Sequence, residues 1–334
     1  MPRKTKGMDA LQQIRETIKS EMEEYLDVWQ KAMHSDSPLL QEVLNHVVSR
    51  RGKMMRPMLT LLSAKLCGKV NSDTLYSAIA LELLHTATLI HDDVVDESEE
   101  RRGLNSVNQI YDNKIAVLVG DYILSLALEN VAKVSNKGFQ HIISKTTQEL
   151  ASGELMQLKS VHNQEISEDV YFQIIHRKTA SLFSACSEAG ALSTKATEAQ
   201  LQSLTSFGKT LGLCFQIRDD IFDYFPSDAI GKPTGNDMKE GKLTLPAIYV
   251  LREKPNAEML AIAKSVKNLQ ASEADILQLV DYTIKNGGIE YADRCMTDLA
   301  TQAKSMLSGF ERSASTAVYS ALIEYVDYAV RRTH

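Results

Sequence analysis

The chain has 334 residues, of which 44% are hydrophobic and 24% are charged, and its formal net charge is −6. This composition is globular, with ample apolar material for a large core, and the acidic balance argues against a nucleic-acid surface. No apolar run approaches the roughly 18 residues that cross a bilayer, and no signal peptide follows the charged start, so we expect a cytoplasmic protein.

The helical period dominates the chain. Apolar residues recur at three- and four-residue steps from Leu11 to Trp29, which predicts an amphipathic first helix. Ser37 followed by Pro38 is typical of a helix start. Residues 73–97 predict a long helix that is apolar on most sides up to an acidic end, and therefore a helix buried at the centre of a bundle.

Further helices are predicted along the rest of the chain, and no stretch alternates as a strand would. They cover residues 115–135, 139–160, 168–193, 198–224, 244–253, 258–268, 273–285, 287–308 and 313–331. Glycine and proline gather in residues 231–246, which predicts a loop. The four cysteines are scattered, as reduced thiols would be. With no linker-like segment and no short repeat, we expect one all-α domain over residues 1–334, in which residues 1–8 are flexible.

Two aspartate clusters with the same spacing stand at the ends of apolar predicted helices. Their members are Asp92, Asp93 and Asp96 in the first cluster, and Asp219, Asp220 and Asp223 in the second. Carboxylates at i and i+4 of a helix lie about 5–6 Å apart and repel by roughly 3 kcal/mol at an effective dielectric near 20. Mg²⁺ offsets such repulsion, because it binds one or two carboxylates and completes its shell with waters and phosphate oxygens. A single cluster is explained equally well as a solvated acidic helix end, whereas two converging ones predict a metal cage.

Metal held in this way needs a polyanionic substrate, and basic residues stand near both clusters. They are Lys53, Arg56, His85, Arg101, Arg102, Lys178, Lys232 and Lys242. Each of them alone is more often a surface charge. In combination with two acidic clusters they predict diphosphate recognition, in which arginine is the bidentate partner.

With these residues in place, the chain resembles the trans-isoprenyl diphosphate synthases. The matching motifs are Gly52-Lys53-x-x-Arg56-Pro57, the first cluster with Arg101-Arg102-Gly103, Gly120-Asp121, Lys178-Thr179, Gln216 through Asp223, and Gly231 through Asp237 with Gly241-Lys242. They run from about residue 40 to 250 in the order of the family. The resemblance implies a single large all-α bundle of the isoprenoid synthase type, with a central substrate cavity, in an enzyme that is usually a homodimer.

The resemblance also implies a role for each motif. Asp92, Asp96 and Asp219 would bind Mg²⁺, three ions per site, with Asp93, Asp220 and Asp223 in support. The allylic diphosphate would be held by Arg101, Lys178 and Lys232, and by Lys242 in the loop that closes over the site. Isopentenyl diphosphate would be held by Lys53, Arg56, His85 and Arg102. Thr179 and Gln216 would turn their oxygens toward the developing allylic cation.

These roles serve a reaction that needs no protein nucleophile or base. Metal ions stabilise charge on the departing diphosphate, and the double bond of isopentenyl diphosphate then attacks the allylic cation. Preorganised oxygens stabilise that cation in a site closed to water. The final proton can leave to the released diphosphate.

The helix before Asp92 is expected to line the product tunnel. The resemblance assigns this role to the residues four, five, eight and eleven before it, which are Thr88, Ala87, Leu84 and Leu81. Ala87 and Thr88 are small, and no aromatic side chain blocks the path, which favours a medium- to long-chain, octaprenyl-like product for a quinone side chain. Alternatively, the small residues only let two helices pack closely. The exact chain length, the primer, the destination of the product, the dimer interface and the tunnel floor stay open.

Four other functions compete with this interpretation. A short-chain farnesyl or geranylgeranyl diphosphate synthase would share every motif. A class I terpene cyclase would share the first cluster and lack the site of Lys53 and Arg56. A metal phosphohydrolase would use His91-Asp92 as a dyad with His85 and Asp219, and a non-catalytic synthase subunit would have lost an aspartate cluster. A long product would also bring the enzyme into transient contact with membrane.

Overall fold

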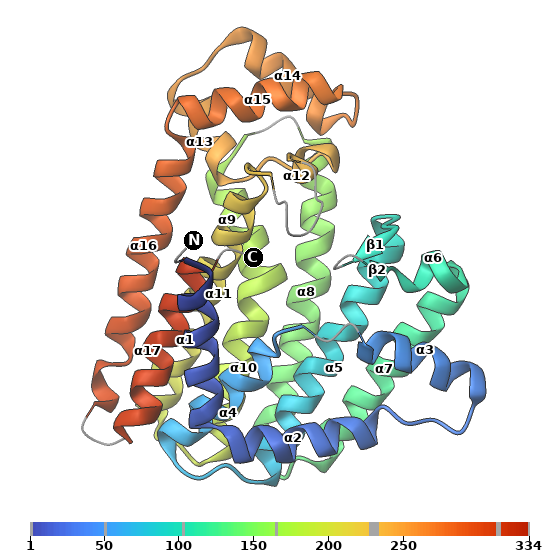
Figure 1. Cartoon of the computed structure of the whole chain (residues 1–334), viewed down its shortest axis with the longest axis vertical. Helices are drawn as coiled ribbons and strands as arrows, with labels where there is room; N and C mark the ends of the chain where they lie inside the picture. Colours follow the sequence, from blue (N-terminus) through green and yellow to red (C-terminus); the bar gives the residue numbers. More distant parts are fainter. Residues whose placement is uncertain are drawn as a thin grey trace.

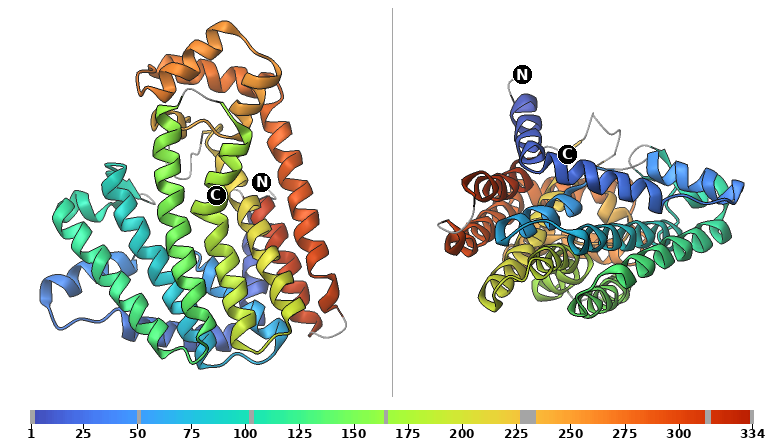
Figure 2. Two further views of the ribbon diagram at one scale, coloured as in Figure 1. Left: turned by 180° about the vertical axis from the view of Figure 1, so that it is seen from behind. Right: turned by 90° about the horizontal axis from the view of Figure 1, so that it is seen from below.

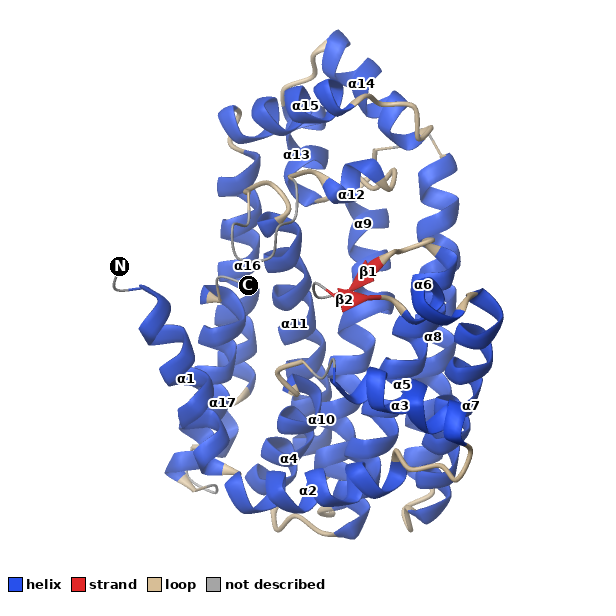
Figure 3. Cartoon of the chain, turned by 45° about the vertical axis from the view of Figure 1, so that its right-hand side comes forward, coloured by secondary structure: helices blue, strands red, loops and turns tan. Residues whose placement is uncertain are grey.

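Apolar residues at helical spacing make the chain helical almost throughout, as the computed structural model of residues 3–49, 52–101, 104–163, 166–226, 234–311 and 315–332 shows (Figure 3). The predicted all-α class is confirmed. Within these ranges the strands are β1 (Glu100–Arg101) and β2 (Leu104–Asn105), which pair antiparallel as a short hairpin that the sequence did not predict. Two residues a strand are too few to alternate, so no period marks them.

The middle of the bundle holds the helices that carry the predicted motifs. They are α4 (Met55–Cys67), α5 (Ser72–Val95), α7 (Asn113–Lys133), α8 (Gly138–His162), α10 (Ser181–Ser193) and α11 (Glu198–Phe222) (Figure 1). Capping boxes fix two of their starts, Asn71 with Thr74 for α5 and Thr197 with Gln200 for α11. α5 is buried along most of its length, as predicted.

The expected helix 168–193 contains a π-helical turn. It is divided into α9 (Glu168–Ile175), the turn η1 (His176–Ala180) and α10. Two glycines let other helices approach η1 closely: a Cβ at Gly153 of α8 would lie 2.7 Å from Arg177 Cβ, and one at Gly212 of α11 would lie 2.6 Å from Ala180 Cα. Isolated π-turns within helices occur frequently at functional sites.

The predicted first helix is two helices. α1 (Arg3–Thr17) and α2 (Lys19–Ala32) meet at Ile18, and α1 already begins inside the segment 1–8 that we expected to be flexible. α1 packs against α17 (Thr316–Arg331), whereas α2 crosses the lower end of the bundle (Figure 1). The same apolar period therefore serves two packing surfaces.

Short helices close the upper end of the bundle (Figure 1). They are α12 (Asn236–Lys239), α13 (Leu245–Glu253), α14 (Ala257–Lys267) and α15 (Glu273–Lys285). A second, smaller apolar cluster that includes Met238, Val266 and Leu279 holds them together. α16 (Gly288–Met306) leads back along the bundle, the 3₁₀ turn η2 (Ser308–Phe310) follows it, and α3 (Pro38–Ser49) and α6 (Val107–Tyr111) lie beside the hairpin.

α7 is the one helix of the described residues that is long and apolar enough to span a membrane by length and composition. The sequence predicted no span here, because no uninterrupted apolar run reaches that length. In its most apolar window 44% of the residues are buried inside the bundle. This is weak support for a membrane span.

Candidate active site

Lys242 links the two aspartate clusters. Its Nζ lies 3.9 Å from Asp96 Oδ2 of the first cluster and pairs with Glu240. Burial lowers the pKa of Lys242, but the carboxylates of Glu240, Asp96 and Asp237 more than reverse this and raise it above its ordinary value. Lys242 thus lies beside Asp96 at the end of α5 and lines the same cavity as Asp220 near the end of α11, so both clusters border a shared space.

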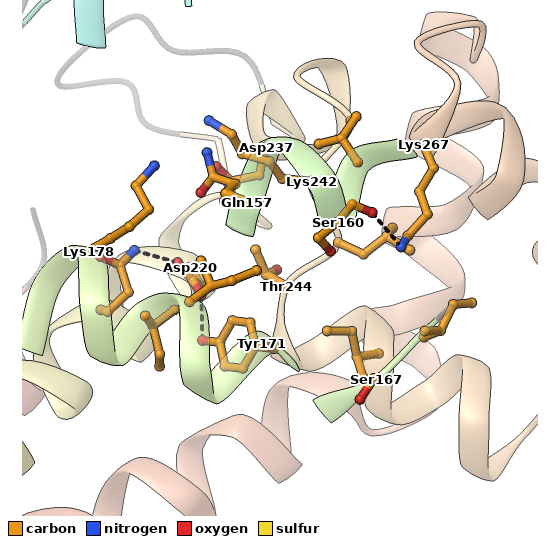
Figure 4. Close-up of a pocket in the computed structure, with 18 of the residues that line it drawn as sticks. Gln157, Ser160, Ser167, Tyr171, Lys178, Asp220, Asp237, Lys242, Thr244 and Lys267 are labelled. Carbon is orange, nitrogen blue, oxygen red and sulfur yellow. Dashed lines mark hydrogen bonds between the residues drawn. The ribbon is translucent and has the colours of Figure 1, made fainter. Parts of the chain in front are cut away.

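The shared space is a cavity of about 220 Å³. Predicted residues from three parts of the chain line it: Lys178, Thr179, Gln216, Asp220 and Lys242 (Figure 4). Its other walls come from α8, α9 and α13, with apolar side chains such as Ile175 and Ile248. A lining that combines charged groups with apolar side chains suits a substrate with a polar head and an apolar tail.

Asp220 points into the protein. Tyr171 Oη donates to its Oδ2 at 2.5 Å, and Gln216 Nε2 donates to its Oδ1 at 2.8 Å (Figure 4). Burial raises the pKa of Asp220 to about 7. The Gln216 carbonyl in turn accepts from Thr179 Oγ1 at 2.6 Å. Asp220 therefore orients the Gln216 amide, and its support of a metal ion stays a prediction.

Asp223 holds the start of α12. Its two carboxylate oxygens accept from the backbone N–H groups of Asn236 and Asp237, at 3.0 and 3.1 Å. Gly235 is required at the start of α12, because its φ is +79° and a Cβ would lie 2.6 Å from Ile276 Cγ2. Burial, followed by Asp223 and Asp220, raises the pKa of Asp237 well above its ordinary value.

Asp219 pairs with the last described residue. Arg332 Nη2 lies 2.7 Å from Asp219 Oδ1 and donates to the Phe215 carbonyl at 2.9 Å. The arginine side chain is only 8% exposed, and its guanidinium lies over the Phe215 ring, 3.7 Å from the centroid. The end of α17 is thereby joined to the second cluster.

In the first cluster, as in the second, the middle aspartate is buried and the first is half-buried. Asp93 is buried and Asp92 half-buried, while Asp96 caps the end of α5. Within the described residues no three acidic, histidine or cysteine side chains converge as ligands of one ion. Each aspartate cluster offers one or two carboxylates, which is the donor set that Mg²⁺ takes when substrate phosphates supply its other ligands.

The expected isopentenyl diphosphate site is assembled only in part. Arg56 Nη1 donates to His85 Nε2 at 2.8 Å, which brings two of its residues together. Lys53 lies over the Tyr328 ring, 5.6 Å from the centroid, and its carbonyl accepts from Arg15. Between them Met54 has a φ of +55°, a strained conformation for a non-glycine residue that is typical of functional turns.

Three predicted cations are not placed. Arg102 and Lys232 lie outside the described residues, as do the neighbouring motif residues Gly103, Gly231 and Pro233. For Arg101 the structure describes the backbone in β1 alone. Their assignments remain predictions.

The proposed tunnel residues lie on α5. Leu81, Leu84 and Ala87 are at most 1% exposed, and Thr88 Oγ1 donates back to the His85 carbonyl. On the neighbouring helix α7, Leu126 is buried, whereas Leu128 is 58% exposed and points away from the interior.

The phosphohydrolase interpretation is not supported by the histidines. His91 lies against α7, where its Nε2 is 3.3 Å from the Val117 carbonyl and 3.5 Å from Asp121 Oδ1. A Cβ at Gly120 would lie 2.2 Å from His91 Nε2, so Gly120 is the residue that allows this approach. His85 contacts Arg56 instead, and the two histidines do not form a ligand set.

Four residues of the site were missed by sequence reasoning. They are Glu154, Tyr171, Asp237 and Arg332. Glu154, Tyr171 and Arg332 act on predicted residues at least 24 positions away, so no local spacing marks them. Asp237 lies inside a quoted motif, and its carboxylate beside Lys242 was the available signal.

Replacing Tyr171 by phenylalanine should lower the free energy of unfolding by about 2 kcal/mol, because a buried bond to a carboxylate is lost. Elongation should slow by roughly tenfold, since Asp220, which orients the Gln216 amide, loses one of its two side-chain donors. Thermal denaturation and steady-state rates measure both effects. Tyr224→Phe is the control: its equally buried hydroxyl bonds the Thr244 hydroxyl, a neutral partner, and should cost about half as much. Equal losses in the two variants would contradict a special role for the bond to Asp220.

Comparisons with known proteins agree on one family. A family profile described as polyprenyl synthetase matches residues 37–283. An octaprenyl diphosphate synthase from Haemophilus influenzae is 34% identical over 303 residues, which are 90% of this chain and 91% of that protein. A solved geranylgeranyl pyrophosphate synthase from Bacteroides thetaiotaomicron is 42% identical, with a TM-score of 0.85 over 97% of this chain and 100% of its own. A polyprenyl synthase from Caulobacter crescentus, complexed with calcium and isoprenyl diphosphate, is 32% identical, with a TM-score of 0.89 over 97% and 98%.

Proposed function

The chain belongs to the polyprenyl synthetase family, and we propose that it condenses isopentenyl diphosphate with an allylic diphosphate, repeatedly, to an octaprenyl-like all-trans polyprenyl diphosphate. It is a prenyltransferase with the all-α isoprenoid synthase fold. One observation carries the proposal: the cavity brings Lys178, Thr179, Gln216 and Lys242 together beside the second aspartate cluster. Destination in a quinone side chain is part of the proposal.

The two aspartate clusters fit divalent metal, which this family uses, and we assign them Mg²⁺, three ions per site. Asp92, Asp96 and Asp219 would bind the ions, while Asp93, Asp220 and Asp223 would orient these three ligands and the residues around them. Bound there, Mg²⁺ would neutralise charge on the allylic diphosphate as it departs. The Caulobacter relative, solved with calcium and isoprenyl diphosphate, supports a divalent ion beside a diphosphate.

The side chains of the cavity do the remaining work. Lys178 and Lys242 present ammonium groups to the allylic diphosphate, and Arg56 with His85 binds isopentenyl diphosphate. Thr179 donates a hydrogen bond to the Gln216 carbonyl, which leaves the lone pairs of the Thr179 oxygen available to the allylic cation. The helices of the upper end exclude water, which would otherwise quench that cation.

Product length is the point on which the relatives' names differ. The Haemophilus relative is named for an octaprenyl product, and the Bacteroides relative, at 42% identity, for a geranylgeranyl product. The small side chains of Ala87 and Thr88 favour the longer product. A short-chain synthase is the second candidate, favoured by the Bacteroides structure.

One assay separates the candidate functions, with dimethylallyl diphosphate as a second primer, from which a farnesyl diphosphate synthase would stop at three isoprene units. The protein is incubated with Mg²⁺, farnesyl diphosphate and labelled isopentenyl diphosphate, and the products are sized by reversed-phase thin-layer chromatography. Growth beyond four isoprene units supports the proposal, and arrest at four supports a geranylgeranyl diphosphate synthase. Diphosphate release without elongation would indicate a cyclase or hydrolase, and inertness a non-catalytic subunit. A chelator control should abolish growth.

The active form is proposed to be a homodimer in the cytoplasm, with transient membrane contact through the product. α7 and α8 run down the same side of the bundle (Figure 2) and expose apolar residues that are 40% to 68% exposed. They are Val117, Leu118, Leu128, Leu155 and Leu158. Such an apolar surface on a soluble protein marks an interface, and a second copy covers it symmetrically.

Replacing Leu118 by glutamate should convert the dimer to monomers, because a charge buried without a partner costs several kcal/mol. Size-exclusion chromatography with light scattering measures the mass. Leu277→Glu, at a half-exposed leucine of α15, is the matched control and should leave the mass unchanged. A Leu118→Glu protein that keeps the dimer mass would contradict this interface.

A further inference from the structure

Lys178, the proposed ligand of the allylic diphosphate, is held by a carboxylate from another helix. Its Nζ lies 2.5 Å from Glu154 Oε2. The two side chains are 23% and 16% exposed, so neither is an ordinary surface charge. Glu154 stands on α8, and Lys178 stands on the π-turn η1.

The backbone fixes this pairing. A Cβ at Gly153 would lie 3.0 Å from Lys178 Cγ and 3.1 Å from Lys178 N, besides its close approach to Arg177. α8 therefore packs against η1 at Gly153, and this contact brings the next residue, Glu154, within reach of the Lys178 ammonium group. Arg177 Nη1 reaches Ser152 Oγ at 3.4 Å on the other side of the same contact.

The second oxygen of the Glu154 carboxylate is also held. Gln157 Nε2 donates to Glu154 Oε1 at 3.3 Å, one turn further along α8. Gln157 and Lys178 both line the cavity, as Figure 4 shows. Glu154 is not among the residues that line it. The carboxylate thus lies behind the lysine, with one oxygen for Lys178 and one for Gln157.

We propose that Glu154 is a positioning residue that fixes the Lys178 ammonium for the allylic diphosphate, an inference that rests on the proposed function. A lysine has three N–H donors on a flexible four-carbon stem. One donor bonds Glu154 and immobilises the stem, and the other two remain for phosphate oxygens. The ordering of the stem then precedes binding of the substrate, which lowers the entropy lost on binding.

The test is a double-mutant cycle on the full-length protein with Glu154→Ala, Lys178→Ala and both together. Glu154→Ala should raise KM for the allylic diphosphate about tenfold, the effect of one lost charge-assisted hydrogen bond, and leave KM for isopentenyl diphosphate unchanged. In the Lys178→Ala background the same change should add nothing, because no ammonium is left to position. Glu154→Gln keeps an acceptor oxygen and should raise the allylic KM by less, about threefold.

A second ion pair provides the control. Lys65 Nζ and Glu21 Oε1 lie 2.5 Å apart between α4 and α2, with side chains 30% and 18% exposed. Glu21→Ala removes a pair of similar length and burial far from the cavity. It should lower the melting temperature as Glu154→Ala does and leave both KM values unchanged.

The cycle separates the two levels of the argument. If Lys178→Ala raises KM for the allylic diphosphate and the two rises add in the double variant, positioning by Glu154 is overturned. The diphosphate role of Lys178 then still holds. An unchanged allylic KM in Lys178→Ala overturns the diphosphate role of Lys178, and positioning with it. Wild-type KM values in both Glu154 variants, or an equal rise of both KM values, also overturn the inference. If Glu154→Ala fails to fold, Glu154→Gln decides by the same criteria.

Discussion

Replacing Asp92 by asparagine should reduce prenyl elongation by at least about 10³-fold, because a neutral amide replaces a carboxylate ligand of the proposed Mg²⁺ and several kcal/mol of transition-state stabilisation depend on that ion. The fold should persist. Asp92 is half-buried at the end of α5, and asparagine keeps its size. Steady-state rates of isopentenyl diphosphate incorporation measure the loss, and circular dichroism with thermal denaturation monitors the fold.

Asp281→Asn is the control for the loss of one negative charge. Asp281 lies on α15, where it is largely exposed and pairs with Lys285 at i+4. The rate of this variant should equal that of the wild type. A rate within tenfold of wild type in Asp92→Asn, at saturating Mg²⁺ and substrate, would contradict the metal role of the first cluster.

The helices could be predicted because their signals are local. Apolar periodicity and caps are contained within each segment, so α5 and α11 lie close to their predicted bounds of 73–97 and 198–224. The break at Ile18 and the π-turn at His176–Ala180 could not be predicted in this way. Both depend on what the helix packs against, α17 on one side and Gly153 and Gly212 on the other.

The candidate site was predictable to the extent that it is charged and repetitive. Two identical aspartate clusters imply a shared metal ion, and the family resemblance assigned the basic side chains to the two diphosphate substrates. What orients those groups was not predictable. Tyr171 and Asp220 are 49 residues apart, and Arg332 follows Asp219 by more than a hundred. Such pairs exist only once α9, α11 and α17 are packed, and burial rather than spacing then sets the pKa of Asp220.

Replacing Ala87 by phenylalanine should shorten the product, because the added ring enters the proposed tunnel near the first cluster. Ala87, Leu84 and Leu81 follow one another along α5 at steps of three residues, about 4.5 Å each. If the chain grows along this face, a bulky side chain should act as a graded stop. Ala87→Phe should give the shortest product, Leu84→Phe a longer one and Leu81→Phe the longest of the three. Reversed-phase thin-layer chromatography sizes the products.

Ala78→Phe separates a block of the tunnel from damage to the core. Ala78 is nine residues before Ala87, so at 100° a residue it faces the opposite side of α5, and both alanines are 1% exposed. Overpacking should cost each variant about 1–3 kcal/mol of stability, whereas the product should shorten only in Ala87→Phe. Equal shortening in both variants would make product length a consequence of a loosened α5. Unchanged length in Ala87→Phe would move the tunnel to another face, since a ring beside the first cluster cannot be passed by a chain that grows along this side of the helix.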